Sequence, residues 1–266
     1  MNRCGVFVLM LLLLSACRPG EPTVDVSPRP DPMPTRTPLP ADTGWLDAGG
    51  GVETRELAIE HKSRRERLFI ARVDPEAVAF QVRYAPGGQR RVREWLEAEG
   101  ARLVVNAGFF DKEFRARGLL ISDGRASGQS YTGFGGLFGV RGGRVQVRSL
   151  ILQPYQPGEP FEQMVQSFPM LLIGDGAVNP EIPKGDEPAP RTVAGLDRSG
   201  RVVLLVSPRS TFALLDLATW LAQSDLDLDV ALNLDGGTSS GLIVRMANKL
   251  WGIDSWAAVP AVILVP

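Results

Sequence analysis

The chain has very little cysteine and histidine, and both shortages restrict the chemistry that it can perform. Of its 266 residues only two are Cys and one is His, and both cysteines, Cys4 and Cys17, lie near the start. The rest of the chain therefore has no disulfide, no Cys nucleophile and no Cys metal site. The single His61 lies in a basic cluster, which argues against a Ser-His-Asp triad or a His-rich zinc site. Any chemistry must depend on carboxylates, Arg, Asn, hydroxyls and backbone amides, and any metal would be an oxygen-liganded cation such as Ca²⁺ or Mg²⁺.

A large excess of charge is also missing. The formal net charge is -1 at pH 7, whereas a domain that binds nucleic acid usually carries a basic stripe. We therefore expect no nucleic-acid partner. The hydrophobic content of 44% is ordinary for a globular protein and is enough to form a core.

The first residues lack an apolar run long enough to cross a bilayer. The run over residues 6–14 is shorter than the about 20 residues that a transmembrane helix requires. With Arg3 before it and Leu-Ser-Ala-Cys at residues 14–17 behind it, the run is typical of a secretory signal peptide, and these four residues resemble a bacterial lipobox. We predict a signal peptide over residues 1–16 and a lipid anchor to the membrane on Cys17. An ordinary secretory signal with an incidental Cys is the alternative.

A Pro-rich stretch follows the predicted lipid site. Arg18, and not Asp, comes directly after Cys17, which by resemblance to Gram-negative sorting indicates the outer membrane of the cell envelope. Pro recurs up to residue 40, and no periodic apolar pattern is present. This composition favours extended, semi-rigid polyproline geometry. We predict a linker over residues 17–50 and a single domain over residues 51–266.

Short strands dominate the pattern of the predicted domain. Helices are expected at residues 91–99 and 211–222, the second with Ser210 as its N-cap. Because strands are many and helices few, we predict an α+β fold with a mixed β-sheet core and a few packed helices. The expected strands cover residues 56–60, 68–73, 78–84, 102–105, 136–140, 144–148, 165–173, 192–196, 201–206, 230–234, 242–246 and 258–265.

Three strand ends carry polar, Gly-rich segments that a purely structural sheet does not require. They are Val-Asn-Ala-Gly-Phe-Phe-Asp at 105–111, Pro-Arg-Thr-Val-Ala-Gly at 190–195 and Ala-Leu-Asn-Leu-Asp-Gly-Gly-Thr-Ser-Ser-Gly at 231–241. Asp235-Gly236 alone is typical of a tight hairpin turn. A turn does not account for Asn233 inside the strand or for the small polar residues that follow, whose amides and hydroxyls could bind an anion.

Arg191 and Asn106 each have an ordinary explanation beside a functional one. Arg191, at the start of a strand, could be a surface residue, although its guanidinium also suits a phosphate through bidentate hydrogen bonds. Asn106 ends a buried strand, where its side chain could hydrogen-bond its own turn or contribute to a site.

Taken in order, these segments resemble the phosphodiester glycosidase family. The matching motifs are Asn-Ala-Gly-Phe-Phe at 106–110, Ser-Phe-Pro-Met-Leu at 167–171, Pro-Arg-Thr-Val-Ala-Gly at 190–195 and Asn-Leu-Asp-Gly-Gly-Thr-Ser-Ser at 233–240. The resemblance runs from about residue 55 to the end of the chain. Ala107 stands where a Gly is frequent, and the Cys-rich extensions of animal members are missing.

The resemblance implies a hydrolase that cleaves a sugar-1-phosphodiester at its glycosidic C–O bond and releases a phosphate monoester. It implies a catalytic role for Asp235 as the carboxylate, for Arg191 as the phosphate ligand and for Asn106 in orienting a sugar hydroxyl or the water. Asp111 and Asp123 are alternative carboxylates. The residues expected to bind the sugar-phosphate substrate are Asn233, Gly236, Gly237, Thr238, Ser239 and Thr192.

A non-catalytic lipoprotein that binds glycans or envelope polymers through the same turns is the main alternative, and a scaffold with a degenerate site is another. A glycan-binding module would expose aromatic side chains for stacking, and Trp251 and Trp256 are the candidates. The combined presence of Asn106, Arg191 and Asp235 favours the enzyme. The sugar, the stereochemical course and any dependence on a cation are left open by the sequence.

Overall fold

The computed structural model describes residues 40–266, so the predicted signal peptide, Cys17 and most of the Pro-rich linker lie outside the described residues. The folded domain begins before the predicted boundary at residue 51. A first strand, β1, covers Leu46–Gly49, and the Arg55 guanidinium pairs with the Asp42 carboxylate at 2.6 Å. The Arg72 guanidinium stacks 4.0 Å from the Trp45 ring centroid, which also fixes the start of the domain.

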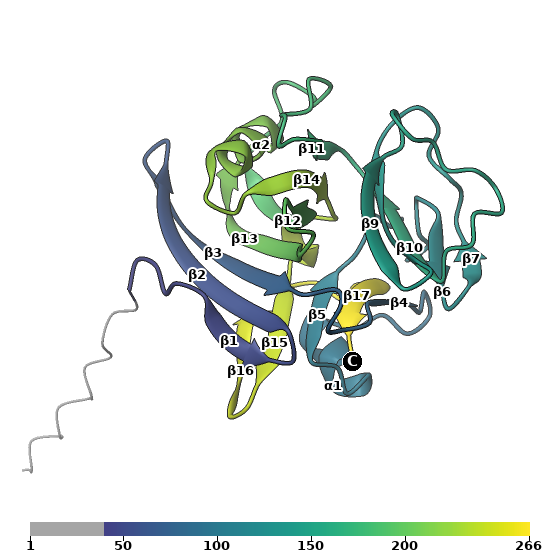
Figure 1. The fold of residues 1–266 in the computed structure, drawn as a ribbon, viewed down its shortest axis with the longest axis horizontal. Helices are drawn as coiled ribbons and strands as arrows, with labels where there is room; N and C mark the ends of the chain where they lie inside the picture. Colours follow the sequence, from purple (N-terminus) through teal and green to yellow (C-terminus); the bar gives the residue numbers. More distant parts are fainter. Residues whose placement is uncertain (1–39) are drawn as a thin grey trace, which may run out of the picture. The chain divides into compact units, whose positions relative to one another are not determined.

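Seven strands form the largest sheet, in the order β1-β2-β3-β13-β12-β14-β11 (Figure 1). Its centre is buried on both sides, and the long β2–β3 hairpin extends from it with the basic cluster at its tip. The strands after β1 are β2 (Val52–His61), β3 (Arg64–Val73), β11 (Met170–Ile173), β12 (Ala189–Asp197), β13 (Val202–Phe212) and β14 (Leu228–Asn233).

Two five-stranded sheets complete the domain. One has the order β7-β6-β10-β8-β9, built from Arg125–Ser127, Leu120–Ser122, Gln163–Ser167, Gly136–Arg141 and Arg144–Ser149. The other has the order β16-β15-β5-β17-β4, built from Lys249–Ile253, Leu242–Met246, Leu103–Asn106, Ala261–Val265 and Gln81–Tyr84.

The prediction of a mixed sheet was wrong in detail, because every strand pairing within residues 40–266 is antiparallel. Parallel neighbours need a crossover of about a dozen residues or more, usually a helix. Residues 40–266 contain only two α-helices, α1 (Val92–Ala98) and α2 (Leu214–Gln223), and consecutive strands that pair with each other do so as antiparallel hairpins. The result is a mostly β architecture of several sheets with two packed helices.

Helix α2 starts later than predicted, and Ser210 is not its N-cap. Strand β13 continues through Ser210 to Phe212, and the helix begins at Leu214. The N–H of Leu214 donates to the Asp186 carboxylate at 3.1 Å, so a distant loop supplies the cap that the local sequence lacks.

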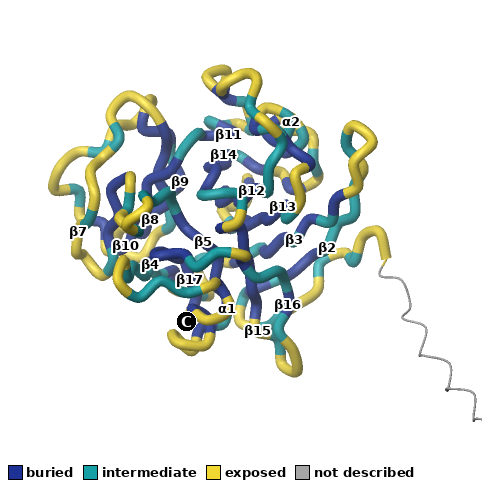
Figure 2. Tube along the Cα trace, turned by 180° about the vertical axis from the view of Figure 1, so that it is seen from behind, coloured by how far each residue is buried: buried dark blue, intermediate teal, exposed yellow. Residues whose placement is uncertain are grey.

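The main core lies where the three sheets face one another. Its buried members come from all three, for example Leu204 and Leu232, Phe138 and Val165, and Val105 and Ile263. Exposed segments are mainly loops and turns at the periphery, whereas β5 and most of β13 are buried (Figure 2). Each buried aliphatic side chain of this kind contributes about 1.5–3 kcal/mol to stability. Among residues 40–266, no helix is long and apolar enough to cross a membrane.

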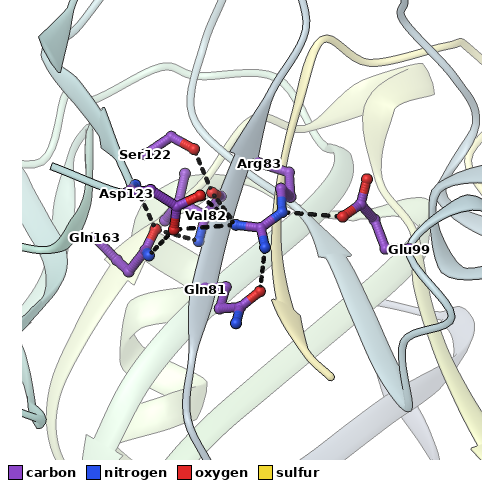
Figure 3. A network of polar contacts seen from close by, with 7 residues as sticks. All are labelled: Gln81, Val82, Arg83, Glu99, Ser122, Asp123 and Gln163. Carbon is purple, nitrogen blue, oxygen red and sulfur yellow. Dashed lines mark hydrogen bonds and ion pairs between the residues drawn. The ribbon is translucent and has the colours of Figure 1, made fainter. Parts of the chain in front are cut away.

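A polar network also joins two of the sheets (Figure 3). The Arg83 guanidinium on β4 pairs with the Asp123 carboxylate at 3.2 Å, and Gln163 on β10 donates to Asp123 at 2.6 Å. The N–H of Val82 donates to the Gln163 side-chain oxygen at 2.9 Å. These contacts hold β4 against the loop after β6, so the Asp123 carboxylate has a structural role there.

Strands β14 and β15 do not form the hairpin that Asp235-Gly236 alone would indicate. β14 pairs with β12 and β11, whereas β15 pairs with β5 and β16 in a different sheet. The segment over residues 234–241 therefore crosses from one sheet to another and contains a short 3-10 turn over Gly237–Ser239. Its polar residues lie at the junction of the two sheets.

Candidate active site

The three polar segments that the sequence singled out lie side by side at this junction. The N–H of Asp235 donates to the Ala107 carbonyl at 3.0 Å, and the N–H of Leu234 donates to the Thr192 carbonyl at 2.8 Å. The end of β5, the start of β12 and the crossing segment thus meet through backbone hydrogen bonds. This convergence links residues more than 120 positions apart in the chain.

Asn106 ties the three segments together with its side chain. It is 0% exposed, and its Nδ2 donates to the Asp235 carbonyl at 2.7 Å. Its Oδ1 accepts from the Thr192 hydroxyl at 2.9 Å and from the Gly241 N–H at 3.1 Å. Because these contacts are all internal, the geometry favours a positioning role for Asn106 and Thr192 over direct contact with a ligand.

Asp235 carries the carboxylate at the centre of the site. Its Oδ1 accepts from the Gly236 N–H at 3.0 Å. Burial raises the pKa of Asp235 from 3.8 to about 6, and hydrogen bonds from the Ser239 hydroxyl and the Gly236 amide oppose this rise. A carboxylate that exchanges its proton near neutrality is suited to general acid–base chemistry.

Buried polar atoms without partners are concentrated around Asp235. Within residues 40–266 there are six such side-chain atoms, and four of them belong to the segments of this site: Asn233 Oδ1, Ser167 Oγ, Ser240 Oγ and Tyr131 Oη. Asn233 Nδ2 donates to the Phe168 carbonyl at 2.8 Å, which brings the Ser-Phe-Pro motif to the site. Unsatisfied polar groups are rare in native interiors and favour a polar ligand at this place.

The glycines after Asp235 allow a close backbone approach. A Cβ on Gly236 would lie 2.7 Å from the Pro190 carbonyl oxygen, and Gly237 has a φ of +61°, in the left-handed region. The Thr238 side chain is exposed, and Ser239 is buried in the turn beside Asp235. Of the predicted substrate-binding residues, Gly236 and Ser239 therefore contact the carboxylate, and Gly237 and Thr238 lie between them in the turn.

The Arg191 guanidinium is held by contacts within the chain. Its Nε donates to the Phe212 carbonyl at 3.1 Å, and its Nη2 donates to the Glu187 carbonyl at 2.8 Å and to the Asp186 carboxylate. Burial lowers the pKa of Arg191, and the pairing with Asp186 opposes this shift. The guanidinium thus holds the loop before β12 against the start of α2, which the prediction of a phosphate fork did not anticipate.

An aromatic wall made of Phe109, Tyr131, Phe134 and Phe168 stands beside the site, and sequence reasoning missed it. Ring centroids lie 4.5 Å apart for Phe109 and Phe168, 4.7 Å for Tyr131 and Phe134, and 5.6 Å for Tyr131 and Phe168. Burial raises the pKa of Tyr131 to about 12, and the Asp235 charge adds to the rise while Arg117 opposes it. Phe109 and Phe168 lie inside two of the matching motifs, but nothing in the sequence indicates that they pack with Tyr131 and Phe134.

The other candidates from the sequence lie outside the site. Asp111 pairs with Arg115 at 2.8 Å in an exposed turn, and Asp123 belongs to the network in Figure 3. Trp251 is buried and donates to Glu56, whereas Trp256 is 85% exposed. The N–H of Trp256 donates to the Thr238 carbonyl at 2.9 Å, so this indole borders the crossing segment.

No group of three or more His, Cys, Asp or Glu side chains within residues 40–266 is arranged to hold a metal ion. A groove of about 550 Å³ is lined by residues such as Arg148, Leu152 and Asp229 and does not include Asp235. The candidate site is therefore defined by the meeting of the three polar segments and by the raised pKa of Asp235, and not by the size of a cavity.

Comparisons with known proteins show the family and the fold of the chain. The family model described as phosphodiester glycosidase matches residues 99–265. The zebrafish N-acetylglucosamine-1-phosphodiester alpha-N-acetylglucosaminidase catalytic domain, auto-inhibited by its pro-peptide, aligns with a TM-score of 0.62 at 20% identity, over 85% of this chain and 84% of that one. A hypothetical protein from Synechocystis aligns with a TM-score of 0.56 at 14% identity, over 81% of this chain and 62% of that one.

At these identities the two structures show a shared fold. No curated protein sequence matches the chain. The family model nevertheless covers most of the chain and includes Asn106, Arg191 and the whole crossing segment with Asp235. The chain belongs to the phosphodiester glycosidase family.

Proposed function

We propose that this protein hydrolyses a sugar-1-phosphodiester at the glycosidic C–O bond and releases a phosphate monoester. The observation that carries the proposal is the partly buried Asp235, whose pKa is raised to about 6, on a segment that also carries the unsatisfied Asn233 Oδ1 and Ser240 Oγ. Membership of the phosphodiester glycosidase family supports the reaction class.

In the proposed reaction Asp235 assists the attack of water on the anomeric carbon. The C–O bond to the phosphate breaks, its electron pair leaves with the phosphate oxygen, and the proton of the water passes to the carboxylate. A phosphate monoester is a good leaving group, so stabilising its new charge matters more than protonating it. The Gly236 N–H already donates to the Asp235 carboxylate, so the amide of Gly237, next in the crossing segment, would assist there.

Asn106 and Arg191 have supporting roles in this mechanism. Asn106 fixes the carbonyl of Asp235, and Arg191 holds the segment that contacts Gly236. Both would keep the carboxylate at the right place, and Asn233 with its free Oδ1 would accept a hydrogen bond from a sugar hydroxyl.

The predicted lipid anchor gives the proposed setting. With Cys17 lipidated and Arg18 after it, the enzyme would act on envelope polymers or glycans that contain sugar-phosphate links. Binding of a glycan without cleavage is the second candidate, and it is favoured by the exposed Trp256 beside Thr238.

The experiment that tests the function is hydrolysis of a panel of chromogenic sugar-1-phosphodiesters, starting with N-acetylglucosamine, with and without Ca²⁺ or Mg²⁺. We expect turnover by the full chain and a loss of at least about a hundredfold in Asp235→Asn. Asp111→Asn is the matched control and should keep full activity. The anomer released first, followed by NMR, reports inversion or retention.

Absence of turnover on every sugar, together with glycan binding that Asp235→Asn retains, would favour the binding protein. Equal activity of Asp235→Asn and Asp111→Asn would refute the assignment of the carboxylate.

A further inference from the structure

A site that releases a phosphate monoester is aided by a cation that is free to bind the phosphate. Arg191 was the expected one, yet its guanidinium already contacts Asp186, Glu187 and Phe212. An Arg fork that is occupied in this way cannot offer two parallel hydrogen bonds to an anion without breaking internal ones. The charge that develops on the leaving group therefore calls for another partner.

Arg117, unlike Arg191, has a guanidinium that is not engaged in internal contacts within residues 40–266. The Arg117 side chain is exposed, and its guanidinium makes no hydrogen bond or ion pair with any residue of the described part of the chain. Its neighbour Arg115, two positions earlier, is paired with Asp111 and Glu113. Of the two guanidinium groups on this loop, only that of Arg117 is available for an anion.

Backbone and ring contacts place Arg117 at the edge of the site. Its N–H donates to the Phe109 carbonyl at 2.9 Å, two residues beyond Ala107, whose carbonyl accepts the N–H of Asp235. The next residue, Gly118, lies against the phenol end of Tyr131, since a Cβ there would be 2.9 Å from the Cζ of Tyr131. Arg117 and the aromatic wall are thus neighbours.

Two charged side chains affect the pKa of the Tyr131 phenol. The two charged side chains that influence its phenol are Arg117, which lowers its pKa, and Asp235, which raises it. Arg117 and Asp235 form no ion pair with each other. The Tyr131 hydroxyl is buried and has no hydrogen-bond partner in the described part of the chain.

We infer that Arg117 binds the phosphate group of the substrate, beside Phe109 and Tyr131. The inference rests on the proposed function and identifies the phosphate end of the site, with the sugar end at Asp235 and Asn233. Cleavage turns a phosphodiester with one negative charge into a monoester with up to two, so Arg117 stabilises the leaving group more than the bound substrate.

The test combines phosphate binding with kinetics for Arg117→Ala, Arg117→Lys and the matched control Arg115→Ala. Affinity for inorganic phosphate is measured by titration calorimetry, which does not depend on turnover. We expect Arg117→Ala to weaken phosphate binding about tenfold or more, because a hydrogen bond to a charged group contributes about 1.5–3 kcal/mol. Arg117→Lys should recover part of the affinity, and Arg115→Ala should bind like the wild type.

With an active enzyme, Arg117→Ala should also lower kcat and not only raise KM. Equal phosphate affinity in Arg117→Ala and Arg115→Ala, or no phosphate binding by the wild type, would overturn the inference. Turnover that is normal in Arg117→Ala would overturn it while leaving the proposed function intact. If the wild type binds phosphate but hydrolyses no phosphodiester, and Arg117→Ala loses this binding, the anion site would be supported and the proposed hydrolysis would be refuted.

Discussion

At the scale of single residues, Asp235 determines how the protein responds to pH. Its pKa is raised from 3.8 to about 6 by burial, so the folded state holds a proton that the unfolded chain has released in this range. Its contribution to stability is therefore fully present below pH 3.8 and is lost as the pH rises through about 6. The loss amounts to at most about 3 kcal/mol, since one pKa unit corresponds to about 1.4 kcal/mol.

We therefore expect Asp235→Asn to match the wild type in acid and to become the more stable protein above pH 6. The free energy of unfolding in urea, measured for both proteins from pH 4 to pH 8, checks this. The other carboxylates are the same in both proteins, so their titration cancels in the difference. A difference that stays constant with pH would contradict the raised pKa.

Activity should increase as the pH rises through about 6, whereas the contribution of Asp235 to stability decreases. A base in the reaction must be deprotonated, so we expect kcat/KM to fall below pH 6 with a slope of one proton. The measurement is a pH–rate profile on a phosphodiester substrate whose own ionisation lies far below this range. A flat acid limb down to pH 4.5 would exclude Asp235 as the base.

Tyr131 offers a second test at this scale. Its hydroxyl is buried without a partner, so Tyr131→Phe should raise the free energy of unfolding by about 1 kcal/mol. The matched control is Tyr84→Phe, because the Tyr84 hydroxyl accepts the Ala116 N–H at 3.0 Å. That variant should lose about 1 kcal/mol or more. The same direction of change in both variants, in urea unfolding, would be evidence against an unsatisfied Tyr131.

At the scale of elements, one side chain couples three segments. Asn106 ends β5 and bonds to Thr192 on β12 and to Asp235 and Gly241 on the crossing segment. Asn106→Ala leaves these buried partners unsatisfied, so we expect it to lower stability by about 3 kcal/mol and to reduce activity through the displaced carboxylate. Urea unfolding and kcat measure the two effects.

The control for this variant is Asn248→Ala, in the exposed β15–β16 turn, which should change stability by less than about 0.5 kcal/mol. Asn106→Ala with wild-type stability would mean that the three segments are held together without this side chain.

The elements also show where sequence patterns work. Short polar or Gly-containing turns between apolar runs located the hairpins β2–β3, β8–β9 and β12–β13, because such turns join neighbouring antiparallel strands. The start of α2 was misplaced because its cap comes from Asp186, far away in the chain. Trp251 was a stacking candidate from its residue type alone, and only packing shows that it is buried.

At the scale of the whole molecule, the predicted anchor on Cys17 determines where the enzyme would work. We expect the full chain to fractionate with membranes and to be released by detergent, and Cys17→Ser to appear in the soluble fraction. Cys4→Ser is the matched control, because Cys4 lies before the predicted cleavage site and its replacement should change nothing. Membrane association that survives in Cys17→Ser would exclude the lipid as the anchor.

The sequence by itself determined the class of chemistry and the segments that take part. With one His and no Cys beyond residue 17, only carboxylates, Arg, amides and hydroxyls were left, and four ordered motifs indicated the family. Those motifs could be recognised because local residue types reflect local chemistry.

Only the tertiary structure decided how these residues are used. It placed β14 and β15 in different sheets, which turned an apparent hairpin into the crossing segment that carries Asp235. It engaged Arg191 with Asp186, whereas the Arg117 side chain has no hydrogen-bond or ion-pair partner among residues 40–266. Burial, pKa and partner choice arise from contacts between distant parts of the chain, and a linear pattern contains no direct record of them.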